Sequence, residues 1–332
     1  MTFTPFSDYL RIIGKGIKMS RPLSQEEAKN AASQIFSNTA SPMQIGAFLL
    51  LLRYRGETSE EIAGLVEGAQ STFNEERPSV TPDIDWPSYA DRHKQQPWFV
   101  LSALLLAQNG FKILMHGVKG ANDGYAPTRP FLRELGIPVS KNLKDAADTI
   151  NDIGLSYIGI ESFCPIVESL CDIRESLGVR TVINTLARAL NPLSADYQLI
   201  GVAHPNYIST HANVAKLLKQ KNSIIIKGGG GEAQRNPFKP CRATVLEEVE
   251  ICEQKWPPLI QQTGVNWRKE ELNPNLAKKL WLGEHHDPYA EGAIIGTTAL
   301  VLRQTKKAGT LQEADTLAAE MWNSRKKYLH DN

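Results

Sequence analysis

Short apolar strands alternate with helical patterns through the middle of this chain, and this alternation limits the fold more than any other feature. The expected strands are 111–115, 156–160, 199–203 and 223–226, and the helical segments between them include 98–107 and 213–218. Strands separated by helices are joined by crossover connections, which place them parallel to one another in one sheet. We therefore predict an α/β domain with a mostly parallel sheet over residues 78–332, with further helices at 290–302 and 311–328.

The N-terminal residues 1–75 show a second pattern, in which apolar residues recur at helical spacing after clear start signals. Ser24 and Thr58 are each followed three residues later by a glutamate, which makes two capping boxes. Ser41 is followed by a proline suited to a first helical turn. We predict a small domain of four short helices over residues 1–75, and a boundary at the proline-rich stretch that begins at Pro78.

Length and charge restrict the function only weakly. A chain of 332 residues exceeds what one hydrophobic core usually serves, which fits two domains. Its 37 basic and 36 acidic residues give a net charge of +1, so any affinity for an anion must come from local clustering. The 4 cysteines lack paired or zinc-type spacing, and no apolar run is long enough to cross a membrane. We expect a cytoplasmic protein with reduced thiols and no membrane contact.

A run of four glycines follows the expected strand at 223–226 and is flanked by basic residues. Such a loop lets backbone N–H groups approach an anion closely. A dinucleotide site is disfavoured because Pro237 interrupts the helix that would bind the pyrophosphate. The alternative interpretation is a flexible loop whose glycines adopt positive φ. The candidate phosphate-binding residues of this segment are Lys227, Gly228, Gly229, Gly230, Arg235 and Lys239.

Several segments together resemble a known family. They are Arg-Pro-Leu at 21–23, Ser-Pro-Met-Gln-Ile-Gly-Ala-Phe at 41–48, His-Gly at 116–117, and 178–186 followed by Asn-Pro at 191–192. Over nearly the whole chain they resemble the glycosyltransferase family 3 proteins that include anthranilate phosphoribosyltransferase. The resemblance implies a nucleoside phosphorylase/phosphoribosyltransferase-like fold, in which a helix near 165–180 completes the helical domain. It also implies a homodimer through that domain, and an acceptor site at His116, Gly117, Arg180 and Asn184.

The chain departs from this family where the enzymes bind phosphoribosyl pyrophosphate and magnesium. Their Gly-Thr-Gly-Gly-Asp loop corresponds to Trp-Pro-Ser-Tyr-Ala-Asp at 86–91, which contains no glycine. Their magnesium-binding Asp-Glu pair falls on Ala233 and Gln234, and neither side chain offers the charged oxygen that the cation prefers. We therefore expect no metal site and no ordinary anthranilate transfer.

The resemblance is closer to the YbiB-like branch of the family, which implies a basic groove that binds nucleic acid, DNA or RNA, without sequence preference. The residues that would contact phosphates are Lys119, Lys227, Arg235, Lys239 and Arg242, together with the glycines 228–230. In this interpretation the protein needs no cofactor. The alternative is a phosphoribosyltransferase with altered donor-site residues, which would use Mg²⁺ and hold an aromatic acceptor at Arg180 and Asn184.

Overall fold

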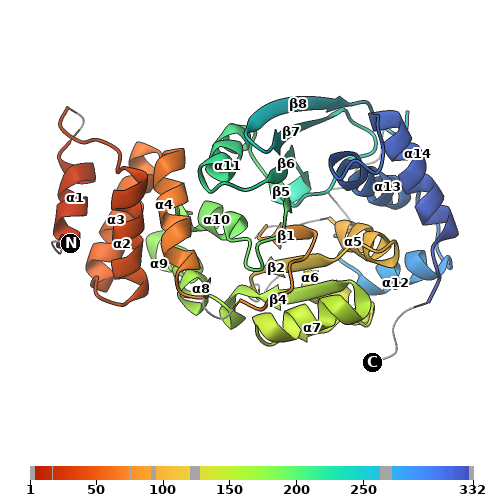
Figure 1. Cartoon of the computed structure of the whole chain (residues 1–332), viewed down its shortest axis with the longest axis horizontal. Helices are drawn as coiled ribbons and strands as arrows, with labels where there is room; N and C mark the ends of the chain where they lie inside the picture. The colour runs from red at the N-terminus through yellow and green to blue at the C-terminus, as the bar shows by residue number, and fades with distance from the viewer. Residues whose placement is uncertain are drawn as a thin grey trace.

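The computed structural model describes residues 4–16, 18–74, 77–90, 95–119, 128–261 and 271–328. A bundle of helices lies at one end of the molecule, and a sheet with helices on both faces forms the rest (Figure 1). The first helix of the described chain lies in the bundle, and the last one lies at the opposite end of the molecule (Figure 1). The predicted arrangement of a small helical domain and a larger α/β domain is confirmed.

The helical domain begins with the helices that the sequence predicts. The side chains of Ser24, Ser41 and Thr58 each accept a hydrogen bond from the third residue of the helix that follows, and all three form complete capping boxes. Helices α2 and α4 pack closely through small residues, because a Cβ on Gly68 would stand 2.4 Å from the Cβ of Ala32. Within the described residues before the sheet, the helices are α1 (Phe6–Gly14), α2 (Gln25–Phe36), α3 (Pro42–Arg55) and α4 (Ser59–Gln70).

The sheet, as far as the chain is described, has eight strands in the order β3-β4-β2-β1-β5-β6-β7-β8. Strands β1 to β6 pair in parallel, and β7 and β8 add an antiparallel hairpin at one edge. The strands are β1 (Ile84–Ser88), β2 (Ile113–Gly117), β3 (Val139–Ser140), β4 (Leu155–Gly159), β5 (Tyr197–Val202), β6 (Asn222–Lys227), β7 (Cys241–Glu247) and β8 (Glu250–Trp256).

The four predicted strands correspond to β2, β4, β5 and β6, with ends shifted by one or two residues. The sequence does not predict β1, because Pro87 cannot donate to a sheet ladder and yet lies inside this central strand. Residues 86–88, compared above with a phosphate-binding loop, are therefore strand; Tyr89 and Ala90 follow it, and Asp91 lies outside the described residues. Strands β7 and β8 lie outside the four strands that the sequence predicts.

Alternate residues of the strands face two different layers of helix. Trp86, Ile113 and Leu199 belong to a core that contains residues of α5, α6, α12, α13 and α14. Leu114 and Ile158, on the other face, share a core with α7 and with the helical domain. The helices of the first layer are α5 (Phe99–Gln108), α6 (Thr128–Glu134), α12 (Pro274–Leu282), α13 (Pro288–Gln304) and α14 (Leu311–Ser324); those of the second are α7 (Leu143–Ile153) and α11 (Asn206–Leu217).

Short helices connect the bundle to the sheet. The segment near 165–180 forms α8 (Pro165–Asp172) and α9 (Arg174–Leu177). Helix α10 (Ile183–Leu186) and the 3₁₀ turn η3 (Ala187–Ala189) follow them. Val167 of α8 and Leu186 of α10 belong to the same core as Phe48 of α3, so one continuous core joins the bundle to the sheet. Across the described ranges, no helix is both long enough and apolar enough to span a membrane.

Candidate functional site

Four of the five predicted phosphate-contacting cations lie along the border of the sheet where the parallel strands have their carboxyl ends. Lys119 follows β2, and Lys227 ends β6. Lys239 precedes β7, and Arg242 is its second residue; β7 begins beside the end of β6, since Ile226 pairs with Ala243. All four side chains are exposed. Four strand spacings separate β2 from β7, or roughly 19 Å at about 4.8 Å per strand. We call these four residues the basic edge.

The fifth predicted cation, Arg235, does not belong to this edge, and its assignment to phosphate binding is wrong. Its side chain is fully buried. Nη1 donates to Asp315 Oδ1 at 2.7 Å, Nη2 donates to the carbonyl of Pro257 at 2.7 Å, and the guanidinium lies 4.7 Å from the centre of the Trp256 ring. The sequence reveals the charge of this residue but not that it points under α14, where an acidic side chain lies beside it.

The glycine run packs against the protein itself rather than forming an open cradle. A Cβ on Gly228 would stand 1.5 Å from the carbonyl oxygen of Glu232, and one on Gly229 would stand 2.1 Å from Nε2 of Gln95. These two positions therefore require glycine for close packing, and the predicted contact of their backbone with phosphate stays a prediction. Gly230 is exposed with a φ of 67°, as the loop interpretation expects, and it stays a candidate for anion contact.

A carboxylate that the sequence analysis does not single out lies behind this loop. Glu232 is buried, and its Oε1 accepts a hydrogen bond from the backbone N–H of Ala90 at 2.7 Å. Burial raises the pKa of Glu232 to about 7, against the opposing effects of the Ala90 N–H, the positive charge of Arg188 and the Ser88 hydroxyl. Within the described structure Oε2 has no hydrogen-bond partner. Its position directly after the glycine run was its sequence signal.

The two residues after Glu232 have structural contacts that do not suit a magnesium site. Ala233 is fully buried and offers no ligand atom. Gln234 accepts the backbone N–H of Phe99 at 3.0 Å through Oε1 and donates to the carbonyl of Gln96 at 3.3 Å through Nε2. Among the described residues no group of three or more His, Cys, Asp or Glu side chains could hold a metal ion. The side chains of Ala233 and Gln234 therefore offer a divalent cation no charged oxygen.

His116, which the family resemblance places at the acceptor site, lies inside the protein. The side chain is fully buried at the end of β2, next to Gly117. Its Nδ1 lies 2.7 Å from the hydroxyl of Tyr89, and its Nε2 lies 3.1 Å from Oδ1 of Asp85, out of line for a hydrogen bond. Gln198 donates to the other oxygen of Asp85 at 2.8 Å. These four side chains form a buried polar network on the face of the sheet toward the helical domain. Its sequence signal was the polar Asp85 between the two apolar residues of its strand.

Of the three other predicted acceptor residues, Gly117 ends β2, and Arg180 and Asn184 lie in the segment of short helices that connects the bundle to the sheet. Arg180 precedes α10, Asn184 lies in it, and both are half-buried. The carbonyl of Asn184 accepts a hydrogen bond from Nη1 of Arg188 at 2.5 Å. The charge of Arg188 also lowers the pKa of His211, which burial and this charge bring to about 3. Arg188 therefore couples electrostatically to both the inter-domain helices and Glu232, and the sequence analysis does not assign it a role.

Comparison with known families covers both parts of the chain. Residues 7–72 match the helical bundle domain of a glycosyl transferase family, and residues 100–326 match the a/b domain of that family. The chain belongs to this glycosyl transferase family.

Curated relatives of this family member are enzymes. It is 26% identical to the anthranilate phosphoribosyltransferase of Prochlorococcus marinus (strain NATL1A) over 96% of this chain and 94% of the relative. It is 31% identical to the enzyme of the same name from Thermomicrobium roseum, over 62% of this chain and 60% of that one.

Solved structures agree on the fold of the family. Anthranilate phosphoribosyltransferase from Thermus thermophilus superposes with a TM-score of 0.79 at 23% identity, covering 92% of each chain. The Saccharomyces cerevisiae enzyme, in complex with PRPP and Mg, gives a TM-score of 0.75 at 18% identity, covering 96% of this chain and 93% of that one. At these identities the likeness establishes the fold alone.

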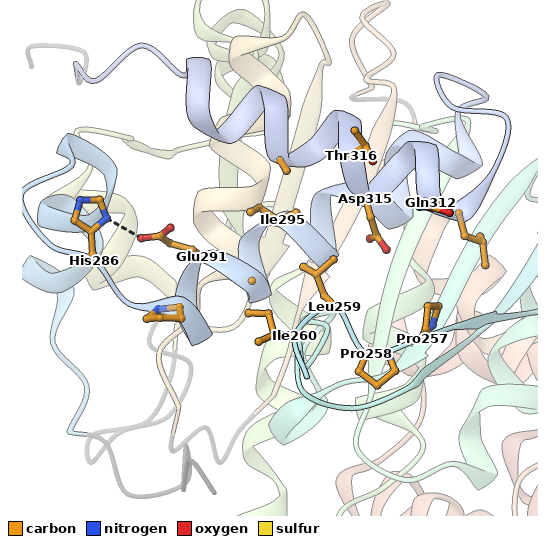
Figure 2. Close-up of a pocket in the computed structure, with 14 residues that line it drawn as sticks. Pro257, Pro258, Leu259, Ile260, His286, Glu291, Ile295, Gln312, Asp315 and Thr316 are labelled. Carbon is orange, nitrogen blue, oxygen red and sulfur yellow. Dashed lines mark hydrogen bonds and ion pairs between the residues drawn. The ribbon is translucent and has the colours of Figure 1, made fainter. Parts of the chain in front are cut away.

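A hollow of about 990 Å³ lies elsewhere on this family member, between the residues that follow β8 and helices α13 and α14. Its walls are mostly apolar, and Figure 2 shows Leu259 and Ile260 opposite Asp315 and Thr316 of α14. His286 and Glu291 lie 3.1 Å apart at one end. None of the predicted site residues lines this hollow, although Asp315 connects it to the buried Arg235.

Proposed function

We propose that this protein binds nucleic acid, DNA or RNA, without sequence preference along the basic edge. The observation that carries the proposal is that Lys119, Lys227, Lys239 and Arg242 are all exposed on one edge of the sheet, over roughly 19 Å. This length exceeds what a single pyrophosphate would need and suits successive phosphates of a polymer. Open α/β sheets bind their ligands at the carboxyl ends of the strands, where this edge lies.

The charges around the basic edge support binding of an anion. Across the described part of the chain, no carboxylate lies within ion-pair distance of Lys119, Lys227 or Lys239. Arg242 has one acidic neighbour, Glu253, whose oxygen lies 4.0 Å from Nη1, and both side chains are well exposed. Such a pair contributes little in water and can exchange for a phosphate. The net charge of +1 does not oppose this, because affinity follows the number of phosphates neutralised.

The competing function is phosphoribosyl transfer to an aromatic acceptor, using Mg²⁺. The names of the similar enzymes favour it, since they match nearly the whole chain. Arg180 and Asn184 would then bind the acceptor. The contacts of Ala233 and Gln234 weigh against it, because developing charge on a departing pyrophosphate needs a metal or fixed donors.

The two functions are separated by titrating the purified protein with two unrelated labelled single-stranded oligonucleotides at several salt concentrations. The proposal expects similar affinity for both sequences and a steady loss of affinity as salt rises. A parallel calorimetric titration with phosphoribosyl pyrophosphate and Mg²⁺ should show no binding in the micromolar range and no turnover of anthranilate. Micromolar, magnesium-dependent binding of that donor, with no affinity for oligonucleotides, would replace the proposal by the transferase function.

We also propose that the protein forms a homodimer through the helical domain. Helix α3 exposes an apolar stripe, in which Met43, Leu50 and Tyr54 are 84%, 40% and 88% accessible. A helix that is apolar on all sides is normally buried, and a two-fold contact would cover this stripe on both copies. Light scattering at micromolar concentration should give twice the mass of 36.8 kDa, and Leu50→Glu should return the mass to that of one chain. A wild-type monomer would refute the dimer.

A further inference from the structure

We propose that the hollow between the residues after β8 and helices α13 and α14 binds a small apolar molecule that carries a protonated amine. The ligand class follows from two features of its walls, which are mostly apolar and whose carboxylates, Glu291 and Asp315, are acidic. The inference concerns a second site and does not depend on nucleic acid binding at the basic edge.

The hollow has the size and the walls of a site for an organic ligand. Its volume of about 990 Å³ suits a drug-sized molecule, and sites for such molecules are mostly apolar. Leu259, Ile260 and Ile295 are all partly accessible to solvent. In Figure 2 they lie between Glu291 at one end and Asp315 at the other. An aromatic or aliphatic ring placed there would remove these side chains from water, which stabilises a complex.

The wall formed by residues 257–260 offers no free backbone N–H group to an acidic ligand. Pro257 and Pro258 have no N–H at all. The N–H groups of Leu259 and Ile260 both donate to the carbonyl of Pro237, at 2.8 and 3.0 Å. Carboxylates and phosphates are bound through such donors, so this wall does not suit them.

Both helices that line the hollow begin beside a carboxylate of their own. Asp287 caps α13, and its side chain accepts two of the first N–H groups of the helix. Glu313 lies in the first turn of α14 and accepts the N–H groups of Gly309 and Thr310, at 2.8 and 3.2 Å. These carboxylates offset the positive ends of the helices, which therefore attract a further anion less.

The two carboxylates that line the hollow differ in how far a cation offsets their charge. Oδ1 of Asp315 accepts Nη1 of Arg235 at 2.7 Å, so this charge is balanced by a buried guanidinium. Glu291 lies 3.1 Å from Nδ1 of His286, whose side chain is 79% exposed and is charged only when protonated. Across the described residues no lysine or arginine forms an ion pair with Glu291. Glu291 therefore supplies the negative charge that an amine would meet, and Asp315 supplies a further hydrogen-bond acceptor.

The test is a titration, followed by ligand-detected NMR, with naphthylmethylamine, the neutral naphthylmethanol and naphthoic acid, which share one ring system. Thr316→Trp fills the hollow from an exposed position of α14, and Asn323→Trp places the same side chain on the same helix outside the hollow. Glu291→Gln removes the charge, and Glu320→Gln, at an exposed position of α14 outside the hollow, is its matched control. Thermal unfolding establishes that each variant folds.

We expect the wild type to bind the amine at least about tenfold more tightly than the acid, with the alcohol between them. A partly exposed carboxylate changes affinity by up to about fivefold, and it attracts the amine while it repels the acid. Thr316→Trp should remove amine binding, and Glu291→Gln should remove most of the preference for the amine, whereas both control variants should behave as the wild type. Acid binding as tight as amine binding, no binding of any of the three compounds, or equal effects of a variant and its control would overturn the proposal.

Two further measurements keep the result decisive. If Thr316→Trp, but not Asn323→Trp, lowered the mass found by light scattering, the hollow would be an interface between copies of the chain, and the proposal would fall. Should Thr316→Trp fail to fold, the comparison of Glu291→Gln with Glu320→Gln decides alone, and an unchanged preference for the amine in Glu291→Gln would overturn the proposal.

Discussion

Replacing Glu232 by glutamine should make the protein more stable at neutral and alkaline pH and should change how its stability depends on pH. Burial raises the pKa of this carboxyl from 4.5 to about 7 in the folded protein. Between these values the folded state binds more protons than the unfolded state, so the free energy of unfolding falls as pH rises. The free-energy cost of ionising the buried Glu232 carboxyl is absent below pH 4.5 and complete above about pH 7.

The size of the effect follows from the two pKa values. The rise of the Glu232 pKa from 4.5 to about 7 lowers the free energy of unfolding by roughly 3 kcal/mol once the carboxyl is fully ionised, and about 2.5 kcal/mol of this loss develops between pH 5 and pH 8. Urea unfolding of the wild type and of Glu232→Gln at both pH values isolates this contribution, since other groups cancel in the difference. We expect the variant to gain about 2 to 3 kcal/mol relative to the wild type on going from pH 5 to pH 8. A difference that does not change with pH would show that Glu232 is not desolvated as the structure indicates.

Two further substitutions test the packing that positions the site. Asp315→Ala should lower the free energy of unfolding by about 3 to 5 kcal/mol, because it removes the ion-pair partner of the buried Arg235. The control Asp196→Ala breaks an exposed pair with Lys221 and should change the free energy of unfolding by less than about 1 kcal/mol. Similar losses for the two variants in urea titrations would contradict the role of Arg235. Gly68→Ala should cost about 1 to 3 kcal/mol by forcing α2 and α4 apart, whereas Gly46→Ala, where a Cβ meets nothing within 4 Å, should be neutral or stabilising in thermal unfolding. A tolerated Gly68→Ala would refute the close packing of these helices.

The sequence predicts the elements of this fold well where one local signal decides them. The capping boxes at Ser24 and Thr58 locate helix starts because a side chain and a nearby backbone N–H suffice to make them. Strand β1 is different, since its pairing with β2, in which Pro87 lies opposite His116, holds the proline in a strand against its own preference, while β5 pairs only with Ile84 and Asp85.

The site is less predictable because direction and burial come from the tertiary structure. Lys227 and Arg235 are equally basic in the sequence, but one ends a strand at the surface and the other pairs with Asp315 of a helix eighty residues away. The same holds for Glu232, whose raised pKa results from burial against the distant segment that follows β1. The sequence shows which residues are charged, but the tertiary structure determines which of them are exposed to a ligand.

The central claim is that the basic edge binds phosphates of a polymer, and the salt dependence of oligonucleotide affinity tests it most directly. Four contacts would give a plot of log affinity against log salt with a slope of roughly −2.8 for single strands, and Lys227→Ala should flatten it by roughly 0.7. Lys221→Ala, just before the opposite end of the same strand β6, should leave the slope unchanged. The account predicts this contrast for any oligonucleotide sequence. Equal slopes for wild type and Lys227→Ala, or equal changes in the two variants, would contradict it.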